Sequence, residues 1–494
     1  EVEALAVSLL HADLSPEHER RLVALLRDAG HDVTASHEVV PEMREYERTV
    51  TTVINAYLRP PCREYLDRLA DAAEQVLVMT SAGGLVPVSG AAETPAALLL
   101  SGPAGGVAAG AAAAVANGFP DAITFDMGGT STDVCLVQGG RPEPAGERSV
   151  GGLPVRLPSL DVHTIGAGGG SIASLDAGGA LVVGPRSAGA VPGPACYGRG
   201  GTEPTVTDAD LVAGRIPAGA GLPGLGVLDV DAARTALGTL GLGTPEEAAA
   251  GVLAVVDASM EQALRAVSVE RGVDPRGLAL VAFGGAGPLH ACALADALGM
   301  AAVIVPARAG VLSAVGILGA PRQVDLVRSW PTPGDLEGLD GALAALGEQA
   351  AAEAGEGATV ELAVDCRYVG QSHEITVAGV GDFAEAHRQR NGYARPGAPV
   401  EVVALRATAQ VAPPISLDDL PAPERAGATG PTVIAEEDCT IWVPDGWVAE
   451  PGTQGALVLR RTTASHLVDV EMESFGEGVG AGSTQAEDDG LDPA

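Results

Sequence analysis

The stretch ITFDMGGTSTDVCLV, residues 123–137, decides the fold. Apolar runs flank a polar centre, a pattern that predicts a strand, a tight turn and a second strand. An ordinary hairpin turn needs only one glycine and one Asp or Asn. This turn has two glycines, three hydroxyl side chains and two aspartates. We therefore interpret it as a binding loop rather than as a plain hairpin.

The residue types in this loop favour a phosphate site. The backbone amides of Gly128 and Gly129 can approach phosphate oxygens because no Cβ stands in the way, and Thr130 adds a hydroxyl donor. Asp126 ends the first strand and can hold a hydrated Mg²⁺, while Asp133 can position water or metal from the far side of the turn. We predict Asp126 and Asp133 as catalytic residues and the other three as phosphate-binding residues.

A second glycine segment is AFGGAGPLH, which ends at His290. Three glycines between a strand and a helix suit contact with a nucleotide, and the helix N-terminus adds a favourable dipole. Such a turn is a weak signal alone and gains weight from the hairpin upstream. We predict Gly284, Gly285 and Gly287 as nucleotide-binding residues. For His290, a cap or packing role is at least as well supported as catalysis.

A third segment, DVHTIGAGGGS, begins at Asp161. Asp161 and His163 share a side if the segment is extended, so they are either metal ligands or an acid–base pair. A hydrogen-bonded loop histidine is an equally weighted alternative. With Asp126, they form the predicted set of metal ligands, and Asp208 is a weaker candidate. Cys196 is either a nucleophile or, as we favour, structural, because no base lies near it in the sequence.

Composition excludes several chemistries. All 29 basic residues are arginine and the net charge is −35. Without lysine there is no lysine-bearing P-loop, Schiff base or pyridoxal phosphate site. The acidic balance argues against nucleic acid and anionic membranes as partners. The six cysteines form no C-x-x-C pair, and the apolar runs are shorter than a membrane span, so we expect a cytoplasmic protein with reduced thiols.

Alternation of strands, glycine turns and helices predicts an α/β fold with ligands at strand ends. A long helix is expected over residues 44–72, interrupted at Pro60–Pro61, with Arg44 and Arg48 on a solvated ion-pair face. After residue 327 the sequence pattern predicts more strands than before it. The predicted division is a remnant of an N-terminal domain (1–61), a core with the nucleotide site (62–326), a β-rich C-terminal domain (327–462) and a disordered acidic tail (463–494).

The order of the segments resembles the actin/sugar-kinase/Hsp70 ATPase architecture, which is ribonuclease H-like. More closely, the chain resembles the hydantoinase A/5-oxoprolinase (N-methylhydantoinase A) family over residues 38–320. The phrases that carry the resemblance are PEMREYERTVTTVINAYLRP, LLSGPAGGV, FDMGGTSTDV, LDVHTIGAGGGSIA, GPACYGRGG, PTVTDADL, SVERGVDPR and AFGGAGPLHACALA.

The resemblance implies an ATP- and Mg²⁺-dependent enzyme that hydrolyses a cyclic amide of the hydantoin or 5-oxoproline type by phosphorylating its carbonyl oxygen. The chain would be the A-type subunit of a hetero-oligomer with a B-type subunit. The alternatives are the ATP-using subunit of an acetone- or acetophenone-type carboxylase, or a non-catalytic truncated homologue. Family members carry a further Gly-Gly-Thr loop nearer the N-terminus, which we expect this chain to lack because its sequence opens at EVEALAV.

Overall fold

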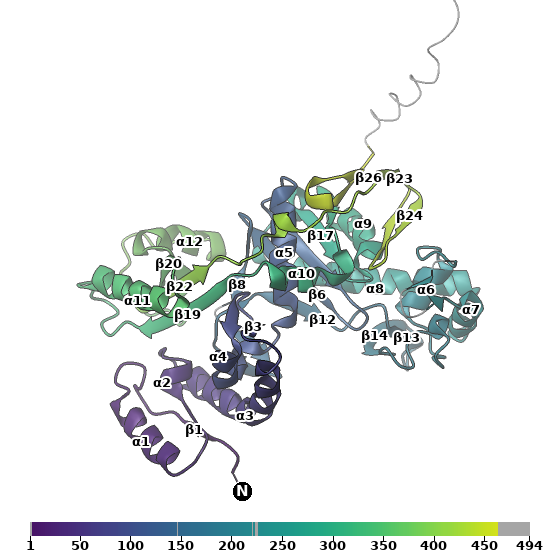
Figure 1. The fold of residues 1–494 in the computed structure, drawn as a ribbon. Helices are drawn as coiled ribbons and strands as arrows, with labels where there is room; N and C mark the ends of the chain where they lie inside the picture. The colour runs from purple at the N-terminus through teal and green to yellow at the C-terminus, as the bar shows by residue number, and fades with distance from the viewer. Residues whose placement is uncertain (1, 146, 220, 223–225, 463–494) are drawn as a thin grey trace, which may run out of the picture.

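The computed structural model describes residues 2–145, 147–219, 221–222 and 226–462. The predicted acidic tail, residues 463–494, lies outside the described residues. A central α/β body is flanked by a helical N-terminal part, a second sheet with α11 and α12, and a small part with α6 and α7 (Figure 1). Among the described residues, no helix has the length and hydropathy that crossing a bilayer requires.

The central sheet has the strand order β12-β6-β5-β17-β18-β27-β26-β23. Strands β5 and β6 form the predicted antiparallel hairpin, and β12 pairs antiparallel with β6. Strands β17 and β18 run parallel to β5 on its other side. The bounds are β5 Ala122–Met127, β6 Thr132–Gln138, β12 Val162–Ile165, β17 Ala279–Phe283, β18 Ala302–Val305, β23 Ala428–Thr429, β26 Trp447–Pro451 and β27 Leu457–Arg461.

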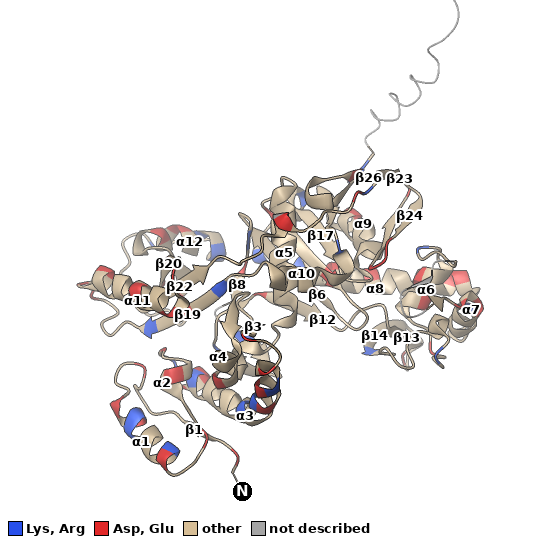
Figure 2. Cartoon of the chain, viewed as in Figure 1, with Lys and Arg blue, Asp and Glu red and all other residues tan. Residues whose placement is uncertain are grey.

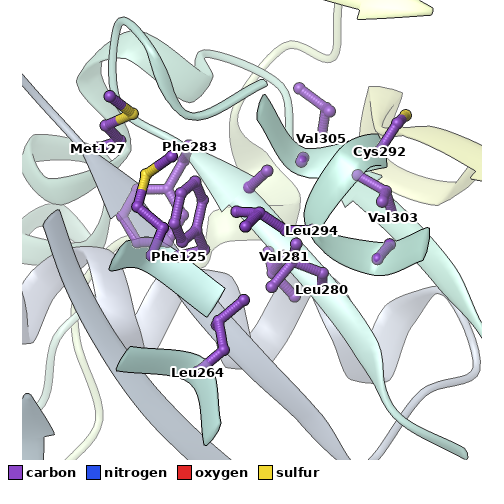
Figure 3. Close-up of a cluster of buried hydrophobic side chains, with 14 of the residues drawn as sticks. Phe125, Met127, Leu264, Leu280, Val281, Phe283, Cys292, Leu294, Val303 and Val305 are labelled. Atoms are coloured by element: carbon purple, nitrogen blue, oxygen red, sulfur yellow. The ribbon is translucent and has the colours of Figure 1, made fainter. Parts of the chain in front are cut away.

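Helices cover both faces of this sheet, and small residues set how closely they approach. Helices α5 (Gly102–Ala116) and α10 (Leu312–Leu318) lie on one face, and α8 (Pro245–Val267) and α9 (Gly287–Leu298) on the other. A Cβ at Gly106 would lie 2.6 Å from a ring carbon of Phe283. The glycine- and alanine-rich helix is therefore a packing surface. Phe125, Met127 and Phe283 lie together in the apolar core that this packing encloses (Figure 3).

The N-terminal part consists of two parallel strands between helices. Strands β1 (Leu5–Val7) and β2 (Val33–Ala35) pair with each other and pack between α1 (Glu17–Asp28) and α3 (Glu45–Ala70). Helix α3 is continuous, so the predicted interruption at Pro60–Pro61 is wrong. Tertiary contacts hold the helix around the prolines, since Arg59 donates to Val33 O and to Glu93.

The second sheet has the order β21-β20-β22-β19-β4-β3. It combines residues 77–87 with residues 322–411, and the predicted boundary at 326/327 falls inside β19. Strands β23, β26 and β27 instead extend the central sheet, so residues 327–462 contribute to two sheets. The elements are β3 Leu77–Met79, β4 Leu85–Pro87, β19 Arg322–Ser329, β20 Thr359–Tyr368, β21 Ile375–Val377, β22 Val400–Val411, α11 Leu339–Ala354 and α12 Phe383–Asn391.

The remaining elements lie around these sheets. The glycine- and proline-rich region after residue 150 contains short strands and short helices. The elements are α2 Ser36–Val39, α4 Val88–Glu93, β7 Arg141–Pro142, β8 Pro144–Ala145, β9 Arg148–Val150, β10 Leu153–Val155, β11 Ser159–Leu160, β13 Ser171–Leu175, β14 Leu181–Ser187, α6 Val206–Val212, β15 Gly221–Leu222, β16 Gly226–Val227, α7 Val230–Gly238, β24 Thr432–Ala435 and β25 Thr440–Val443.

A buried ionic network joins the N-terminal part, the central body and the second sheet. The Glu42 carboxylate accepts hydrogen bonds from Arg156 Nε at 2.7 Å and from Arg406 Nη2 at 3.2 Å. Arg406 also donates to Asp365, which is fully buried. Charged residues of both signs are interspersed over the elements in Figure 2. Arg156 and Arg406 thus form buried ion pairs that connect different parts of the structure.

Ion pairing also places Arg48 differently from the prediction. Arg48 is 1% exposed, so the expected solvated face is wrong for this residue. Its guanidinium donates to Asp13 Oδ1 at 2.6 Å and to the carbonyl oxygens of Leu9 and Glu42. These partners come from segments distant in the sequence, which the helix pattern does not show.

Candidate functional site

The β5–β6 hairpin places its two aspartates directly opposite each other. Asp126 pairs with Asp133 in the antiparallel register, and Thr164 of β12 is opposite Asp133 on the other side. Residues opposite each other in neighbouring strands share a face of the sheet. The two predicted catalytic carboxylates therefore lie side by side next to the turn of the hairpin.

The two carboxylates carry charge that no basic side chain balances. Among the described residues, no arginine or histidine is one of the causes that shift the pKa of either aspartate. Burial and the charge of Asp133 raise the pKa of Asp126 to about 6, against a hydrogen bond from Ser313 that lowers it. Burial also raises the pKa of Asp133, against a hydrogen bond that Thr164 donates at 2.5 Å. This unbalanced negative charge suits a divalent cation.

The turn between the strands exposes backbone donors beside these carboxylates. Gly128 N donates to Ser131 O at 3.1 Å and closes the turn. Gly129 and Thr130 are exposed, and their amides have no partner among the described residues. A Cβ on Gly129 would meet no atom within 4 Å. The turn therefore leaves two backbone donors open to solvent, a geometry that suits an anion.

The second glycine segment packs against the first from the neighbouring strand. Gly284 has φ +78°, and a Cβ there would lie 2.4 Å from Asp126 Oδ1 and 2.4 Å from Met127 O. Ala286 N donates to Met127 O at 3.0 Å. Gly285 is exposed with open space around its Cα, and Gly287 begins α9. The structure thus brings the predicted nucleotide glycines to the same end of the sheet as Asp126.

Replacing Gly284 with alanine is expected to lower the free energy of unfolding by roughly 1–3 kcal/mol, because the new methyl group meets two oxygens and the backbone conformation disfavours L side chains. Urea unfolding followed by circular dichroism measures this change. Gly285→Ala is the matched control, since it meets nothing within 4 Å and has no positive φ. Equal stability of the two variants would contradict the close approach at Gly284.

Sequence reasoning missed a third glycine segment, residues 166–171, as part of the site. Gly169 N donates to Gly128 O at 3.0 Å, and Gly170 N donates to Gly129 O at 2.7 Å. A Cβ on Gly168 would lie 2.7 Å from Thr130 N. The signal was three consecutive glycines just after a strand, which is unusual unless another backbone approaches closely. The segment forms the wall that supports the hairpin turn.

Asp161 and His163 lie elsewhere. His163 is opposite Val134, so it lies on the other face of the sheet from Asp126 and Asp133. There it lines a pocket of about 420 Å³ against α8. Asp161, just before the strand, forms an ion pair with Arg271. The structure therefore does not bring these two residues together with Asp126 around one metal ion.

Other candidates are structural. Asp208 caps α6, where it accepts from Thr205 and from the amides of Ala195 and Cys196. Burial and the charge of Asp208 raise the pKa of the Cys196 thiol, which disfavours a nucleophilic thiolate. Among the described residues, the one group of three or more His, Cys, Asp or Glu side chains spaced for a metal is Glu436, Asp438 and Cys439. Arg425 and Gly310 N already bind its carboxylates.

Comparison with known proteins now becomes informative. The family model described as hydantoinase/oxoprolinase matches residues 48–324. The chain belongs to the hydantoinase/oxoprolinase family. The matched region contains the hairpin and all three glycine segments.

Individual members of the hydantoinase/oxoprolinase family are similar over different lengths. The caprolactamase subunit alpha of Pseudomonas jessenii is 36% identical over 90% of this chain and 75% of its own length. The 5-oxoprolinase 1 of Arabidopsis thaliana is 37% identical over 64% of this chain and 27% of its own length. An uncharacterized protein of Methanocaldococcus jannaschii is 38% identical, and this chain spans only 60% of its length.

Solved structures confirm the predicted fold class. The ATP-dependent caprolactamase from Pseudomonas jessenii superposes with a TM-score of 0.82, at 34% identity over 94% of this chain and 77% of the solved one. Nucleotide-free acetone carboxylase superposes with a TM-score of 0.72, at 25% identity over 93% of this chain and 76% of the solved one. The fold is that of the actin-like ATPases.

Proposed function

We propose that this protein is the nucleotide-using subunit of an ATP-dependent hydrolase of cyclic amides. The observation that carries the proposal is the open hairpin turn, with the free amides of Gly129 and Thr130 beside the unbalanced carboxylates of Asp126 and Asp133. Relatives named caprolactamase and 5-oxoprolinase support the same class of substrate. The particular ring that is opened is a matter for substrate screening.

Each part of the site has a role in this proposal. The amides of Gly129 and Thr130 bind phosphate oxygens of ATP, and Gly285 leaves room for the nucleoside. Asp126 and Asp133 would hold Mg²⁺, which when bound neutralises charge on the phosphates. Transfer of the γ-phosphoryl group to the amide carbonyl oxygen releases ADP and turns the carbonyl carbon into a better electrophile. A first water attacks that carbon, the ring C–N bond breaks and the nitrogen takes a proton, which leaves an acyl phosphate. A second water attacks the same carbon and breaks its bond to the phosphate oxygen, so that a carboxylate and inorganic phosphate are released.

Partner and compartment belong to the same proposal. A B-type subunit is proposed to supply the cyclic-amide pocket, since the relatives named as subunits belong to assemblies. A cytoplasmic location agrees with the six free cysteines, all of which lie in the described residues. The division of the chain at residues 61/62, 326/327 and 462/463 is also part of this proposal.

A carboxylase is the second candidate, favoured by the similarity to acetone carboxylase. The same ATP site would then activate a substrate or bicarbonate for carbon–carbon bond formation. ATP-dependent consumption of bicarbonate with a ketone, and no ring opening of caprolactam, hydantoin or 5-oxoproline, would favour this candidate. The third alternative, a non-catalytic homologue, predicts that complexes assemble and function normally with Asp126→Ala.

Calorimetric titration of the 494-residue chain with Mg-ATP tests the proposal. We expect binding that is lost without Mg²⁺. Screening for ATP-dependent ring opening with the partner subunit follows. A folded chain that binds no Mg-ATP, alone or with its partner, would contradict the proposed function.

The affinity for Mg-ATP is expected to fall about tenfold per pH unit below pH 6, because a proton on Asp126 competes with the metal. The free energy of unfolding of the metal-free chain is instead expected to rise as the pH falls. The folded pKa of about 6 lies above the ordinary value of 3.8, so lowering the pH through 6 favours the folded state, and the effect levels off below 3.8. Titrations at pH 7.5, 6.0 and 5.0 measure the affinity, and a pH-independent affinity would contradict metal binding at Asp126.

A further inference from the structure

Outside the hairpin site, a cluster of buried charges lies between α6, α8 and α9. Asp210 of α6 and His290 of α9 are fully buried, with His290 Nε2 3.3 Å from Asp210 Oδ2. His290 Nδ1 lies 2.7 Å from Asp257 Oδ1 on α8. Arg215, just after α6, approaches Asp210 Oδ1 at 3.6 Å, Asp257 Oδ2 at 4.0 Å and His290 Nδ1 at 3.4 Å. Nothing in the proposed chemistry uses these groups.

The short distances from the two ring nitrogens to two carboxylates favour a charged histidine. With both ring nitrogens protonated, Nδ1–H donates to Asp257, and Nε2 lies 3.3 Å from Asp210 Oδ2. Neither Nε2 nor the Asp210 carboxylate has another hydrogen-bond partner of regular geometry among the described residues. The two aspartates then balance His290 and Arg215. A neutral ring would leave Asp210 with only the distant Arg215 as counter-charge, and an uncompensated buried carboxylate is costly.

The charged groups that face His290 come from three elements. They are Asp210 from α6, Asp257 from α8 and Arg215 from the segment after α6, while strands β17 and β18 beneath α9 are entirely apolar. Burial alone would lower the pKa of His290, but the charge of Asp210 and the hydrogen bond to Asp257 outweigh it and raise the pKa to about 9. The ring is therefore charged at neutral pH.

Two of the helices at the cluster, α6 and α9, also contact the glycine segments that pack against the hairpin turn. In α6, the amide and hydroxyl of Thr207 both donate to Gly169 O at 2.8 Å, and Asp210 follows one turn later. In α9, Gly287 ends the glycine segment that packs on Asp126, and His290 follows one turn later. Helix α8 packs against both α6 and α9 (Figure 1).

We propose that the Asp210–His290–Asp257 cluster, with Arg215, is a positioning device that holds glycine segments 166–171 and 284–287 against the hairpin turn while His290 carries both ring protons. His290 is a positioning residue, because it acts through the first turns of α6 and α9. The effect on nucleotide affinity rests on the proposed function, whereas the effect on the two segments does not.

The charge state of His290 is tested first, by NMR of the whole chain labelled with ¹⁵N-histidine. We expect one imidazolium at pH 7.5 that keeps both protons until the pH nears 9 and whose signal is missing from His290→Gln. A His290 ring that titrates near its ordinary value of about 6.5 would overturn the proposal. Asp257→Asn, at a partly exposed position, should shift the titration to lower pH and serves if His290→Gln does not fold.

Amide hydrogen exchange of the nucleotide-free chain tests the positioning. His290→Gln and Asp257→Asn are expected to speed exchange about tenfold in segments 166–171 and 284–287 together, since both walls lose one support. His387→Gln is the matched control, because His387 is buried in the second sheet with the uncharged partners Gln371 and Tyr393 O. Unchanged exchange in either segment, or the same change in the control, would overturn the proposal.

The pH dependence of the Kd for Mg-ATP distinguishes a positioning role of the charged His290 ring from a simple loss of packing, which would not depend on pH. In the wild-type chain, the Kd for Mg-ATP should rise about tenfold between pH 7.5 and 9.5, and His290→Gln should show a weak affinity without this pH dependence. A wild-type affinity that is independent of pH over this range would overturn the positioning role. If no variant binds Mg-ATP, the proposed function fails, and the exchange experiment still decides the positioning claim.

Discussion

Replacing Asp126 with asparagine is expected to lower ATP-dependent turnover about 100-fold or more, because the variant loses the charge that would hold the metal beside the phosphates. Asparagine has the same shape and keeps the contact with Ser313 Oγ at 3.4 Å. Removing the repulsion between Asp126 and Asp133 should also raise the free energy of unfolding at pH 7.5 by roughly 1–3 kcal/mol. Turnover is measured on the complex with its partner subunit, and stability by urea unfolding.

The control for this variant is Asp325→Asn. Asp325 is also a buried aspartate whose pKa burial raises, but it lies in the second sheet, hydrogen-bonded to Gln323 and Thr408. Its substitution is expected to change stability without changing turnover per folded enzyme. A turnover of Asp126→Asn within about threefold of the wild type would show that the hairpin carboxylate does not handle the nucleotide.

Replacing Glu42 with alanine is expected to lower the free energy of unfolding by about 2–3 kcal/mol, since it removes the buried carboxylate that Arg156 and Arg406 share. Arg156 then keeps Glu374 as its partner, and Arg406 keeps Asp365. Arg156 and Glu42 are 6% and 2% exposed, so water cannot replace the lost carboxylate easily. The loss should appear in every part of the chain, because the network joins three parts of the structure. Urea unfolding with far-ultraviolet circular dichroism measures it.

Glu361→Ala is the comparison variant for the ionic network. Glu361 pairs with Arg141 at 2.8 Å, but their side chains are 65% and 76% exposed. Exposed pairs contribute about 0–1 kcal/mol, so this substitution should have little effect. If Glu42→Ala lowers the free energy of unfolding no more than Glu361→Ala does, the buried ionic network does not stabilise the folded chain as we expect.

The hairpin site was predictable because its information is local. Strand patterning around Gly128 and Gly129 gave the hairpin and its register, and the register alone places Asp126 opposite Asp133. The glycines at 284, 285 and 287 follow a strand that is parallel to the first, so both segments end at the same edge. Parallel neighbours bring their carboxyl ends together, and this rule did not require tertiary knowledge.

Non-local contacts explain what the sequence could not predict. His163 falls on the opposite face because the pairing of β12 with β6 fixes its register, and a shift of one residue would exchange the faces. The strands after residue 427 look like the strands before them, yet β27 pairs with β18 of the central sheet and is followed there by β26 and β23. The continuity of α3 and the burial of Arg48 both depend on partners from distant segments.

The most direct test of the central claim follows the amide oxygen. A cyclic amide that the complex opens is prepared with ¹⁸O in its carbonyl group and incubated with ATP, Mg²⁺, this chain and its partner subunit. If the carbonyl oxygen is phosphorylated, inorganic phosphate carries the label in proportion to ring opening, and Asp126→Asn releases none. Ring opening that leaves the phosphate unlabelled would contradict carbonyl phosphorylation as the reason that this protein has a nucleotide site.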